Sequence, residues 1–198
     1  MDAAGHLAHD ERLLEQGGEL LRFWESAVPV VVVGRSARIP EQVRIAACEA
    51  DGVRVLRRCS GGGAVVLGPG CLNFSMVFSL AARPRWRDVH RSVREILAPI
   101  ARALSAEVAG ESDLTWRGRK VSGNAQRRTS GMLLHHGTLL YDFDSSLSAR
   151  YLLNPLRQPA YRLGREDADF LGNLPFSAQE IRKKVAAAFE ADLYLEDD

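Results

Sequence analysis

The central part of the chain alternates short runs of β-branched and apolar residues with turns that contain glycine, and this pattern constrains the fold most strongly. The first run, Val28 to Val33, is interrupted only by Pro29 and closed by Gly34, which is typical of a buried strand. Further strands are predicted at Val53 to Arg57, Ala64 to Leu67, Leu72 to Leu80, Asp113 to Trp116, Lys120 to Arg127 and Met132 to Tyr141.

Apolar residues with helical spacing flank these strands. They predict helices at Asp10 to Glu25, Glu41 to Ala50, Trp86 to Leu104 and Ala178 to Leu193, the last begun by Ser177 as N-cap with Glu180 three residues on. We expect Pro99 to kink the third helix. This arrangement favours an α+β fold with a central, largely antiparallel or mixed sheet flanked by helices, over a repeating βαβ wheel. With 198 residues and no convincing linker, a single domain spanning 1–198 is expected.

Composition and charge argue against several classes of protein. A formal net charge of +1 is unlike that of a general nucleic-acid binder. No apolar stretch approaches the ~20 residues of a membrane-spanning helix, and the N-terminus lacks the basic start and apolar run of a signal peptide. Cys48, Cys59 and Cys71 have no spacing that suggests a zinc site or a disulfide framework. We therefore expect no nucleic-acid partner, no membrane association, no metal-binding residues and a cytoplasmic location.

Lysine is rare in this chain, which makes Lys120 conspicuous. Of 26 Lys+Arg, three are lysine, and Lys120 stands alone through the first 182 residues. Lysine is a compact point charge on a slender stem, whereas arginine is a planar fork, so the exception indicates a site that needs a compact cation. The surrounding basic residues fall into two clusters, which would create an anion-binding site if the fold joined them. They are Arg117, Arg119, Lys120, Arg127 and Arg128 in one, and Arg54, Arg57 and Arg58 in the other.

Three consecutive glycines, Gly61, Gly62 and Gly63, follow a predicted strand. Glycine lets the backbone approach a ligand closely and adopt positive φ, so that successive N–H groups can converge on an anion. The segment matches neither a P-loop nor a GxGxxG motif that opens a helix. It predicts either a ligand-binding loop or an ordinary hairpin turn.

Polar side chains share one face of the predicted strand that begins at Lys120. Alternation places Lys120, Ser122 and Asn124 on one face and Val121 on the other, as expected for a polar ligand wall. Asp113 lies within reach of Lys120 across a hairpin, or of a bound cation. His135 and His136 are adjacent and point to opposite faces of their strand, so at most one of them lines a site.

Four strings of this sequence together resemble the biotin/lipoate A/B protein ligase family, and within it the lipoate–protein ligase A type. They are RRCSGGGAVV at Arg57–Val66, LNFS at Leu72–Ser75, SDL at Ser112–Leu114, and GRKVSGNAQRR…HHGTLLYDFD at Gly118–Asp144. The resemblance implies a catalytic domain similar to class II aminoacyl-tRNA synthetases and biotin synthetase. It also implies an enzyme that activates lipoate, or octanoate, with ATP to an acyl-adenylate and transfers the acyl group to a lysine of an acceptor domain.

The resemblance assigns roles to particular residues. By match, Lys120 is the catalytic residue that contacts the acyl carbonyl and the adenylate phosphate. ATP, with Mg²⁺, is the expected cofactor and lipoate the expected substrate. The residues expected to bind the ligand or nucleotide are Arg58, Ser60, Gly61, Gly62, Gly63, Ala64, Val65, Val66, Asp113, Ser122, Gly123, Ala125, His136, Gly137 and Thr138.

Two departures from the family pattern keep alternatives open. Leu67-Gly68 stands where the family commonly has His-Asp, so the polar function of that pair is missing. The chain ends at Asp198 without room for the small C-terminal domain of many bacterial ligases, which suggests a separate accessory subunit or a transfer-only enzyme. An ATP-independent acyl transferase would need Cys59 or Cys71 as a thiol of lowered pKa. A cofactor-binding module without catalysis is a third alternative. The expected acceptors are acidic lipoyl-type domains.

Overall fold

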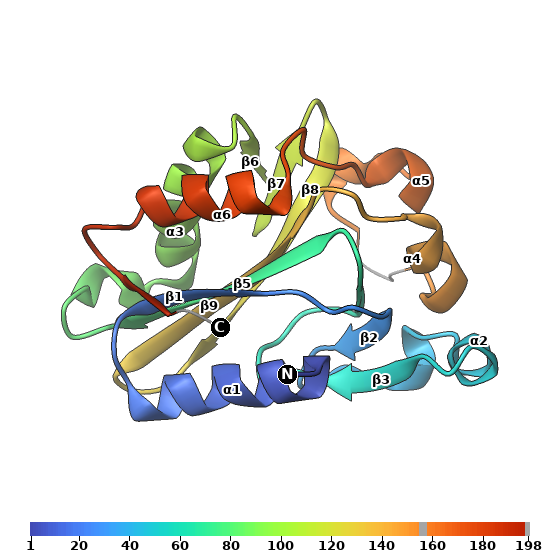
Figure 1. Ribbon diagram of the computed structural model, residues 1–198, viewed down its shortest axis with the longest axis horizontal. Coiled ribbons are helices and arrows are strands. Elements are labelled where there is room, and N and C mark those ends of the chain that lie inside the picture. The colour runs from blue at the N-terminus through green and yellow to red at the C-terminus, as the bar shows by residue number, and fades with distance from the viewer. Residues whose placement is uncertain (155–157, 197–198) are drawn as a thin grey trace.

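A large mixed sheet is the centre of the computed structural model, which describes residues 1–154 and 158–196 (Figure 1). Within those residues the sheet has seven strands, antiparallel except for the pair β10 and β1. Their order across the sheet is β10 (Tyr194–Glu196), β1 (Leu20–Trp24), β5 (Cys71–Ser79), β9 (Met132–Leu140), β8 (Arg119–Arg128), β7 (Asp113–Trp116) and β6 (Glu107–Ala109).

A second, smaller sheet lies beside the first and consists of β3 (Arg54–Arg57), β2 (Val30–Val33) and β4 (Val65–Leu67), in that order. β2 is parallel to β3 and antiparallel to β4, with Val31 opposite both Val55 and Val66. The four valines of β2 are all buried, as the unbroken β-branched run predicts for a central strand. The short helices α2 (Ile45–Ala50), α4 (Ser146–Tyr151) and α5 (Asp167–Phe170) lie at this end of the molecule (Figure 1).

The two faces of the large sheet are covered by different helices (Figure 1). Along β5, Leu72, Phe74, Met76 and Phe78 point to one face, where they pack against α3 (Val89–Ala103) and α6 (Ala178–Ala187). Val77 points to the other face and packs against Leu13 and Leu14 of α1 (Ala3–Gln16). The polar residues Asn73 and Ser75 share that second face, which is therefore the one that can carry a site.

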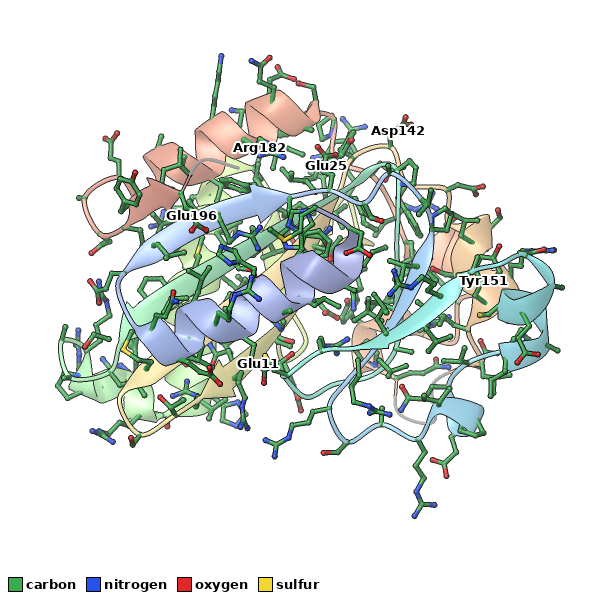
Figure 2. All side chains as sticks on the ribbon, turned by 60° about the horizontal axis from the view of Figure 1, so that its bottom comes forward. Glu11, Glu25, Asp142, Tyr151, Arg182 and Glu196 are labelled. Carbon is green, nitrogen blue, oxygen red and sulfur yellow. The ribbon has the colours of Figure 1, made fainter. Side chains whose placement is uncertain are left out.

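The edge of the large sheet near the C-terminus is tied down by side chains as well as by the backbone. Glu25, just after β1, accepts a hydrogen bond from Tyr141 Oη at 2.6 Å and faces Arg182 of α6 at 3.5 Å. Figure 2 shows Glu25 and Arg182 beside each other where β1 meets that helix. The hydrogen bond to Glu25 and burial raise the pKa of Tyr141 to about 12. None of the described helices is both long and apolar enough to cross a bilayer.

The α+β class and the predicted strands are confirmed, whereas several helix predictions were wrong at their ends. Asp10 to Glu25 is not one helix, because Gly17 and Gly18 adopt φ of 78° and 109° and end α1, after which Leu20–Trp24 forms β1. The predicted last helix has its capping box of Ser177 and Glu180 but ends at Ala187, and the chain then enters β10.

The two middle helices also differ from prediction. Glu41 to Ala50 contains the end of a 3-10 turn, η1 (Ile39–Glu41), and only then α2. Trp86 to Leu104 divides into a 3-10 turn, η2 (Pro84–Arg87), and α3, because the Asp88 carboxylate accepts a hydrogen bond from Arg91 N–H at 2.7 Å and begins the helix there. α3 continues through Pro99 to Ala103. A further 3-10 turn, η3 (Ala160–Arg162), was not predicted.

Candidate active site

A cavity of about 670 Å³ lies between the polar face of the large sheet and the small sheet. Strands β5, β8 and β9 provide one wall, through residues that include Asn73, Ser122 and Thr138. The glycine segment and β4 provide another, and residues from α4 to α5 complete the lining. The cavity is mostly apolar at Trp24, Val32 and Leu67, with charged groups placed at intervals, which is typical of a site for a small ligand.

Lys120 lines the cavity and is held by a carboxylate. Its Nζ lies 2.8 Å from Oδ1 of Asp113, the residue opposite Gly123 on the neighbouring strand β7. Tyr161 Oη donates a hydrogen bond to the other oxygen of Asp113 at 2.7 Å. Burial and the same carboxylate raise the pKa of the Tyr161 hydroxyl, so this hydroxyl keeps its proton and remains a donor. The predicted pairing of Asp113 with Lys120 is therefore present.

A β-bulge interrupts the alternation of side chains just after Lys120. Leu114 pairs with Ser122 and Thr115 pairs with Lys120, so Val121 is an extra residue on β8. Val121 is fully buried in the main core, while Lys120, Ser122 and Asn124 all line the cavity. The prediction that Lys120, Ser122 and Asn124 share one face was wrong. The extra residue leaves Lys120 on the face of Asp113 and Gly123, whereas Ser122 and Asn124 align with Leu72 and Phe74 on the other face. The bulge itself was not predicted, because nothing in the local residue pattern marks it.

Arg58 organises the glycine segment. Its guanidinium donates hydrogen bonds to Ser60 Oγ at 3.1 Å, to the Gly61 and Gly63 carbonyls at 2.7 and 2.9 Å, and to the Val32 carbonyl at 3.3 Å. Burial lowers the pKa of Arg58 to about 10, which still leaves it charged at neutral pH. Gly62 needs its glycine because φ is 93° there, and Gly34 because a Cβ would lie 2.1 Å from the Gly62 carbonyl oxygen.

The N–H groups of this segment have different partners. Ala64 N–H donates to Gln42 Oε1 at 2.7 Å. Those of Gly62 and Gly63 donate to no acceptor in residues 1–154 and 158–196, and both residues line the cavity. Backbone donors of this kind, beside a positive charge, form a cradle for an anion.

The two adjacent histidines lie on opposite faces, as predicted. His136 lines the cavity, with its Nε2 2.6 Å from Ser60 Oγ. His135 is fully buried and contacts Gln126 through Nδ1 at 3.1 Å. Burial, together with His136 and Arg128, lowers the pKa of His135 to about 3, so that it stays neutral.

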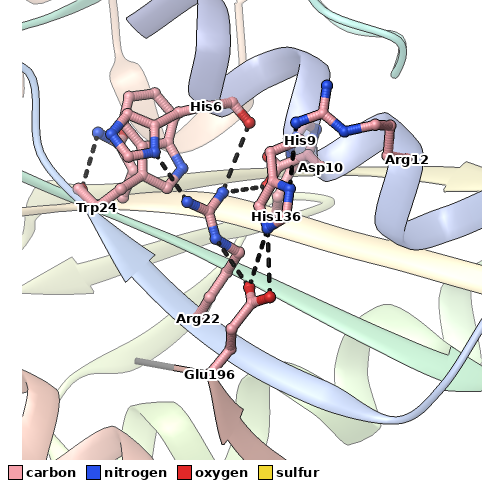
Figure 3. A network of polar contacts seen from close by, with 9 residues as sticks. His6, His9, Asp10, Arg12, Arg22, Trp24, His136 and Glu196 are labelled. Carbon is pink, nitrogen blue, oxygen red and sulfur yellow. Dashed lines mark hydrogen bonds and ion pairs between the residues drawn. The ribbon is translucent and has the colours of Figure 1, made fainter. Parts of the chain in front are cut away.

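Behind His136 lies a buried charged network (Figure 3). Asp10 of α1 is 1% exposed and accepts a hydrogen bond from Arg22 of β1 at 2.9 Å. Arg22 also lies 3.3 Å from Glu196, which in turn contacts His9 at 3.2 Å. Burial acts to raise the pKa of Asp10, but His136, Ser75 and Arg22 outweigh it, and the net effect is a lowered pKa.

Most of the residues predicted for the site line the same cavity. They are Lys120, Arg58, Gly62, Gly63, Ala64, Val65, Val66, Asp113, Ser122, Gly123, Ala125, His136, Gly137 and Thr138. Ser60 and Gly61 are absent from the lining, because Ser60 is buried behind the segment and Gly61 faces outward. The two basic clusters do not converge. Arg57, for example, donates to the carbonyls of Gly34 and Arg35, and only Arg58 and Lys120 of the two clusters line the cavity.

Some lining residues were not predicted. Asp10 and Trp24 come from the N-terminal region, where no local pattern points to a site, and Arg162 and Phe170 come from a segment with no predicted element. Asn73 could have been found, because it is part of the LNFS string that carried the family resemblance. Its Oδ1 accepts a hydrogen bond from Thr138 at 2.9 Å.

Solved structures place this arrangement in a known fold class. The chain superimposes on a bi-partite lipoate protein ligase studied with its E2 lipoyl domain from Thermoplasma acidophilum (TM-score 0.76, 22% identity, 98% of this chain and 80% of that chain). It also superimposes on lipoate-protein ligase A bound with ATP (TM-score 0.77, 22% identity, 97% and 81%). The fold is thus that of the lipoate ligases, the biotin-ligase-like type of class II synthetase fold.

The sequence then defines the family. The chain belongs to the lipoyl protein ligase A/B catalytic domain family, whose model matches residues 2–190. It is 35% identical over 119 residues to the lipoate-protein ligase LplJ of Bacillus subtilis, which is 58% of this chain and 34% of the relative. It is 34% identical over 137 residues to the probable lipoate-protein ligase A of Mycoplasma pneumoniae, 68% of this chain and 40% of the relative. The matched region therefore spans well under half the length of these curated relatives.

Proposed function

We propose that this protein is a lipoate–protein ligase that condenses the carboxylate of lipoate, or octanoate, with ATP to an acyl-adenylate, with release of pyrophosphate. It then transfers the acyl group to a lysine of an acceptor domain, with release of AMP. The observation that carries the proposal is the shared cavity of Lys120 and the N–H groups of Gly62 and Gly63. A cation and a backbone anion cradle in one mostly apolar cavity match an acyl-phosphate anhydride, which has a charged middle and an aliphatic tail.

Lys120 supplies the positive charge in this scheme. Negative charge develops on the attacked carbonyl oxygen and on the phosphate, and a fixed cation in a water-poor site stabilises both. In the ligand-free arrangement Asp113 holds the ammonium at 2.8 Å. The slender stem allows Nζ to turn from Asp113 to the anhydride without filling the space that the acyl chain needs.

The remaining lining divides the ligand between an apolar and a polar region. Trp24, Val32 and Leu67 offer the apolar surface that an eight-carbon acyl chain would cover. Leu67 replaces the histidine common in the family and is 4% exposed, so this position favours hydrocarbon over a phosphate. The structure of lipoate-protein ligase A with ATP supports nucleotide binding by analogy of fold.

In this proposal Mg²⁺ would bind together with ATP, through the phosphates of the nucleotide. No group of three or more His, Cys, Asp or Glu side chains suited to hold a metal occurs among the residues that the structure describes. The ion usually binds through substrate phosphates, waters and one or two carboxylates, and Asp113 is a carboxylate that lines the cavity. The proposed chemistry has no step that runs through the ion.

The test is adenylate formation and its dependence on Lys120. Purified protein with lipoate and ATP should release AMP on addition of an acceptor, and mass spectrometry should detect the bound acyl-adenylate beforehand. Lys120→Ala should lower acyl transfer by about 100-fold or more while the fold persists. Lys120→Arg should not restore activity, because the guanidinium fork needs more room. Near-normal transfer by the alanine variant would sink the mechanism.

The ATP-independent transferase is disfavoured by the cysteines. Burial raises the pKa of Cys59 to about 11 and that of Cys71 to about 12, so neither thiol is activated, and neither lines the cavity. Transfer from an octanoyl carrier protein without ATP, lost on alkylation of cysteine, would favour the transferase instead.

The proposed acceptors are acidic lipoyl-type domains, and a separate accessory subunit is part of the proposal. The bi-partite ligase of Thermoplasma acidophilum and its E2 lipoyl domain support both by fold analogy. Arg117 and Arg119, on the hairpin that carries Lys120, supply positive charge for an acidic partner. Raising salt from low to ~0.5 M should therefore slow transfer to the acceptor more than it slows adenylate formation. Equal salt dependence of the two steps would count against the electrostatic part.

A further inference from the structure

The first helix is connected to the glycine segment through buried polar side chains that the proposed chemistry does not use. Oδ2 of Asp10 lies 3.5 Å from Nδ1 of His136. Nε2 of His136 lies 2.6 Å from Ser60 Oγ, and Arg58 Nε donates to that oxygen at 3.1 Å. We call this chain of four residues, Asp10–His136–Ser60–Arg58, the relay. It spans elements that are far apart in sequence.

The burial of the charged side chains of Asp10 and Arg22 costs free energy, which raises the question of what their position contributes. Asp10 and Arg22 are 1% and 2% exposed, and removing two charges from water costs free energy that their attraction often does not recover. α1 also packs through the apolar residues Leu13 and Leu14 and through His6, which stacks on Trp24. The Asp10 carboxylate faces Nδ1 of His136, where its negative charge favours a proton on that nitrogen.

If the His136 ring is neutral, the donors and acceptors of the relay fit one arrangement of protons. An arginine can only donate, and an ionised carboxylate can only accept. With Asp10 facing Nδ1, the neutral ring carries its proton on Nδ1 and leaves Nε2 as an acceptor. Ser60 then accepts from Arg58 and donates to Nε2. Oδ2 of Asp10 faces Nδ1 at 3.5 Å, an electrostatic contact longer than a hydrogen bond. Asp10, which can only accept, and Arg58, which can only donate, therefore set the direction of donation along the relay.

The relay ends on the segment that forms the anion cradle. Ser60 immediately precedes the three glycines, and its carbonyl accepts a hydrogen bond from Arg35 N–H at 2.8 Å. Ser60 does not line the cavity, so its contribution is to hold the backbone that does. Preorganised N–H groups stabilise a developing anion without a reorganisation cost at the moment of reaction.

We infer that Asp10 and His136 are positioning residues: Asp10 fixes the Nδ1–H tautomer of His136, which holds Ser60 and thereby the N–H groups of Gly62 and Gly63 in their ligand-binding arrangement. The identity of the anion in the cradle rests on the proposed function. The tautomer of His136 and the order of the glycine segment do not, and they can be measured without any substrate.

The test uses the isosteric substitution Asp10→Asn in the full chain. An amide can turn its NH₂ toward Nδ1, which favours the Nε2–H tautomer, and Ser60 then loses its acceptor. Nitrogen-15 NMR of the histidine ring should show unprotonated Nε2 in the wild type and protonated Nε2 in the variant. Hydrogen exchange of residues 58–66 should quicken in the variant, in the absence of ligand. Adenylate formation should fall about 10- to 100-fold in kcat.

A destabilised control variant separates a specific effect on the glycine segment from a general loss of stability. Leu104→Ala removes a fully buried side chain from the α3 core and should leave both the tautomer and the exchange of residues 58–66 as in the wild type. Should Asp10→Asn fail to fold, Ser60→Ala serves instead: it should quicken exchange in the same segment beyond the effect of Leu104→Ala.

The NMR and hydrogen-exchange results test the role of the relay independently of the proposed ligase activity. An unchanged tautomer with wild-type exchange of residues 58–66 in Asp10→Asn would overturn it, and so would wild-type exchange in Ser60→Ala where that variant is used. An acyl ester trapped on Ser60 would also overturn it, since the serine would then be a nucleophile. If the wild type forms no adenylate, the proposed function fails, while the NMR and exchange results still decide the relay.

Discussion

Lys120 shows how much a single residue can indicate through its sequence context. Its isolation among arginines pointed to a site that needs a compact cation, and the neighbouring Asp113 was placed within reach. The structure shows their ion pair at 2.8 Å on the wall of the cavity. Tyr161, which holds the other oxygen of Asp113, lies 48 residues away in sequence and had no local signal.

Gly123 leaves the space that the Lys120 side chain occupies. A Cβ at Gly123 would lie 3.2 Å from both Cε and Nζ of Lys120. Gly123→Ala should therefore displace the ammonium and lower acyl transfer by about 10- to 100-fold, while stability changes by no more than about 0.5 kcal/mol. Steady-state kinetics and denaturant unfolding measure the two effects.

The matched control is Gly131→Ala, in the turn between β8 and β9, where a Cβ would meet nothing within 4 Å. It should leave both transfer and stability unchanged. Equal acyl transfer by Gly123→Ala and Gly131→Ala would show that the close packing of Gly123 against Lys120 does not affect activity.

Among the elements, those whose residues carry a continuous local pattern were predicted well. The valine run of β2 and the alternating residues of β5, β8 and β9 became strands with only small changes at their ends. Helix ends were predicted less well. At Gly17-Gly18 the apolar periodicity runs on across a break in the backbone, and the residues beyond it pair with β5 because an entire sheet edge is available there.

The short helices α2 and α4 are joined by a surface cluster whose strength should depend on pH. Asp51 accepts hydrogen bonds from Arg150 at 2.7 Å and from Tyr151 at 2.8 Å, and these lower its pKa to about 2. A depressed pKa means that the stabilisation is present above about pH 4 and is lost as pH falls toward 2.

Asp51→Asn should therefore flatten the decrease in stability between about pH 4 and pH 2. Denaturant unfolding at a series of pH values measures the slope. Glu49→Gln, on the same helix, is the control and should retain the wild-type slope. A wild-type slope in the Asp51 variant would show that this cluster does not link α2 to α4.

In the whole molecule, the cavity is made by two sheets together. β4 and the glycine segment belong to the small sheet side, whereas Lys120 and His136 belong to the large sheet. A ligand that contacts both sides must therefore stabilise their association, since it binds the folded form and not the unfolded chain.

We expect lipoate with ATP to raise the free energy of unfolding by about 2.7 kcal/mol when the concentration of free ligand is 100 times its Kd. Thermal or denaturant unfolding with and without the two compounds measures this. ATP with acetate is the control, because a two-carbon acid cannot cover the apolar wall at Trp24, Val32 and Leu67. Equal stabilisation by acetate and lipoate would contradict an acyl site in this cavity.

Local patterns in the sequence were enough to identify most strands and to show that the two adjacent histidines face opposite ways. These properties are local, because backbone conformation and the alternation of side chains depend on near neighbours. The pairing of β10 with β1 and the approach of Asp10 to His136 became visible in the folded chain alone. Both contacts join residues that are distant in sequence, and packing of the whole chain, rather than any local preference, selects them.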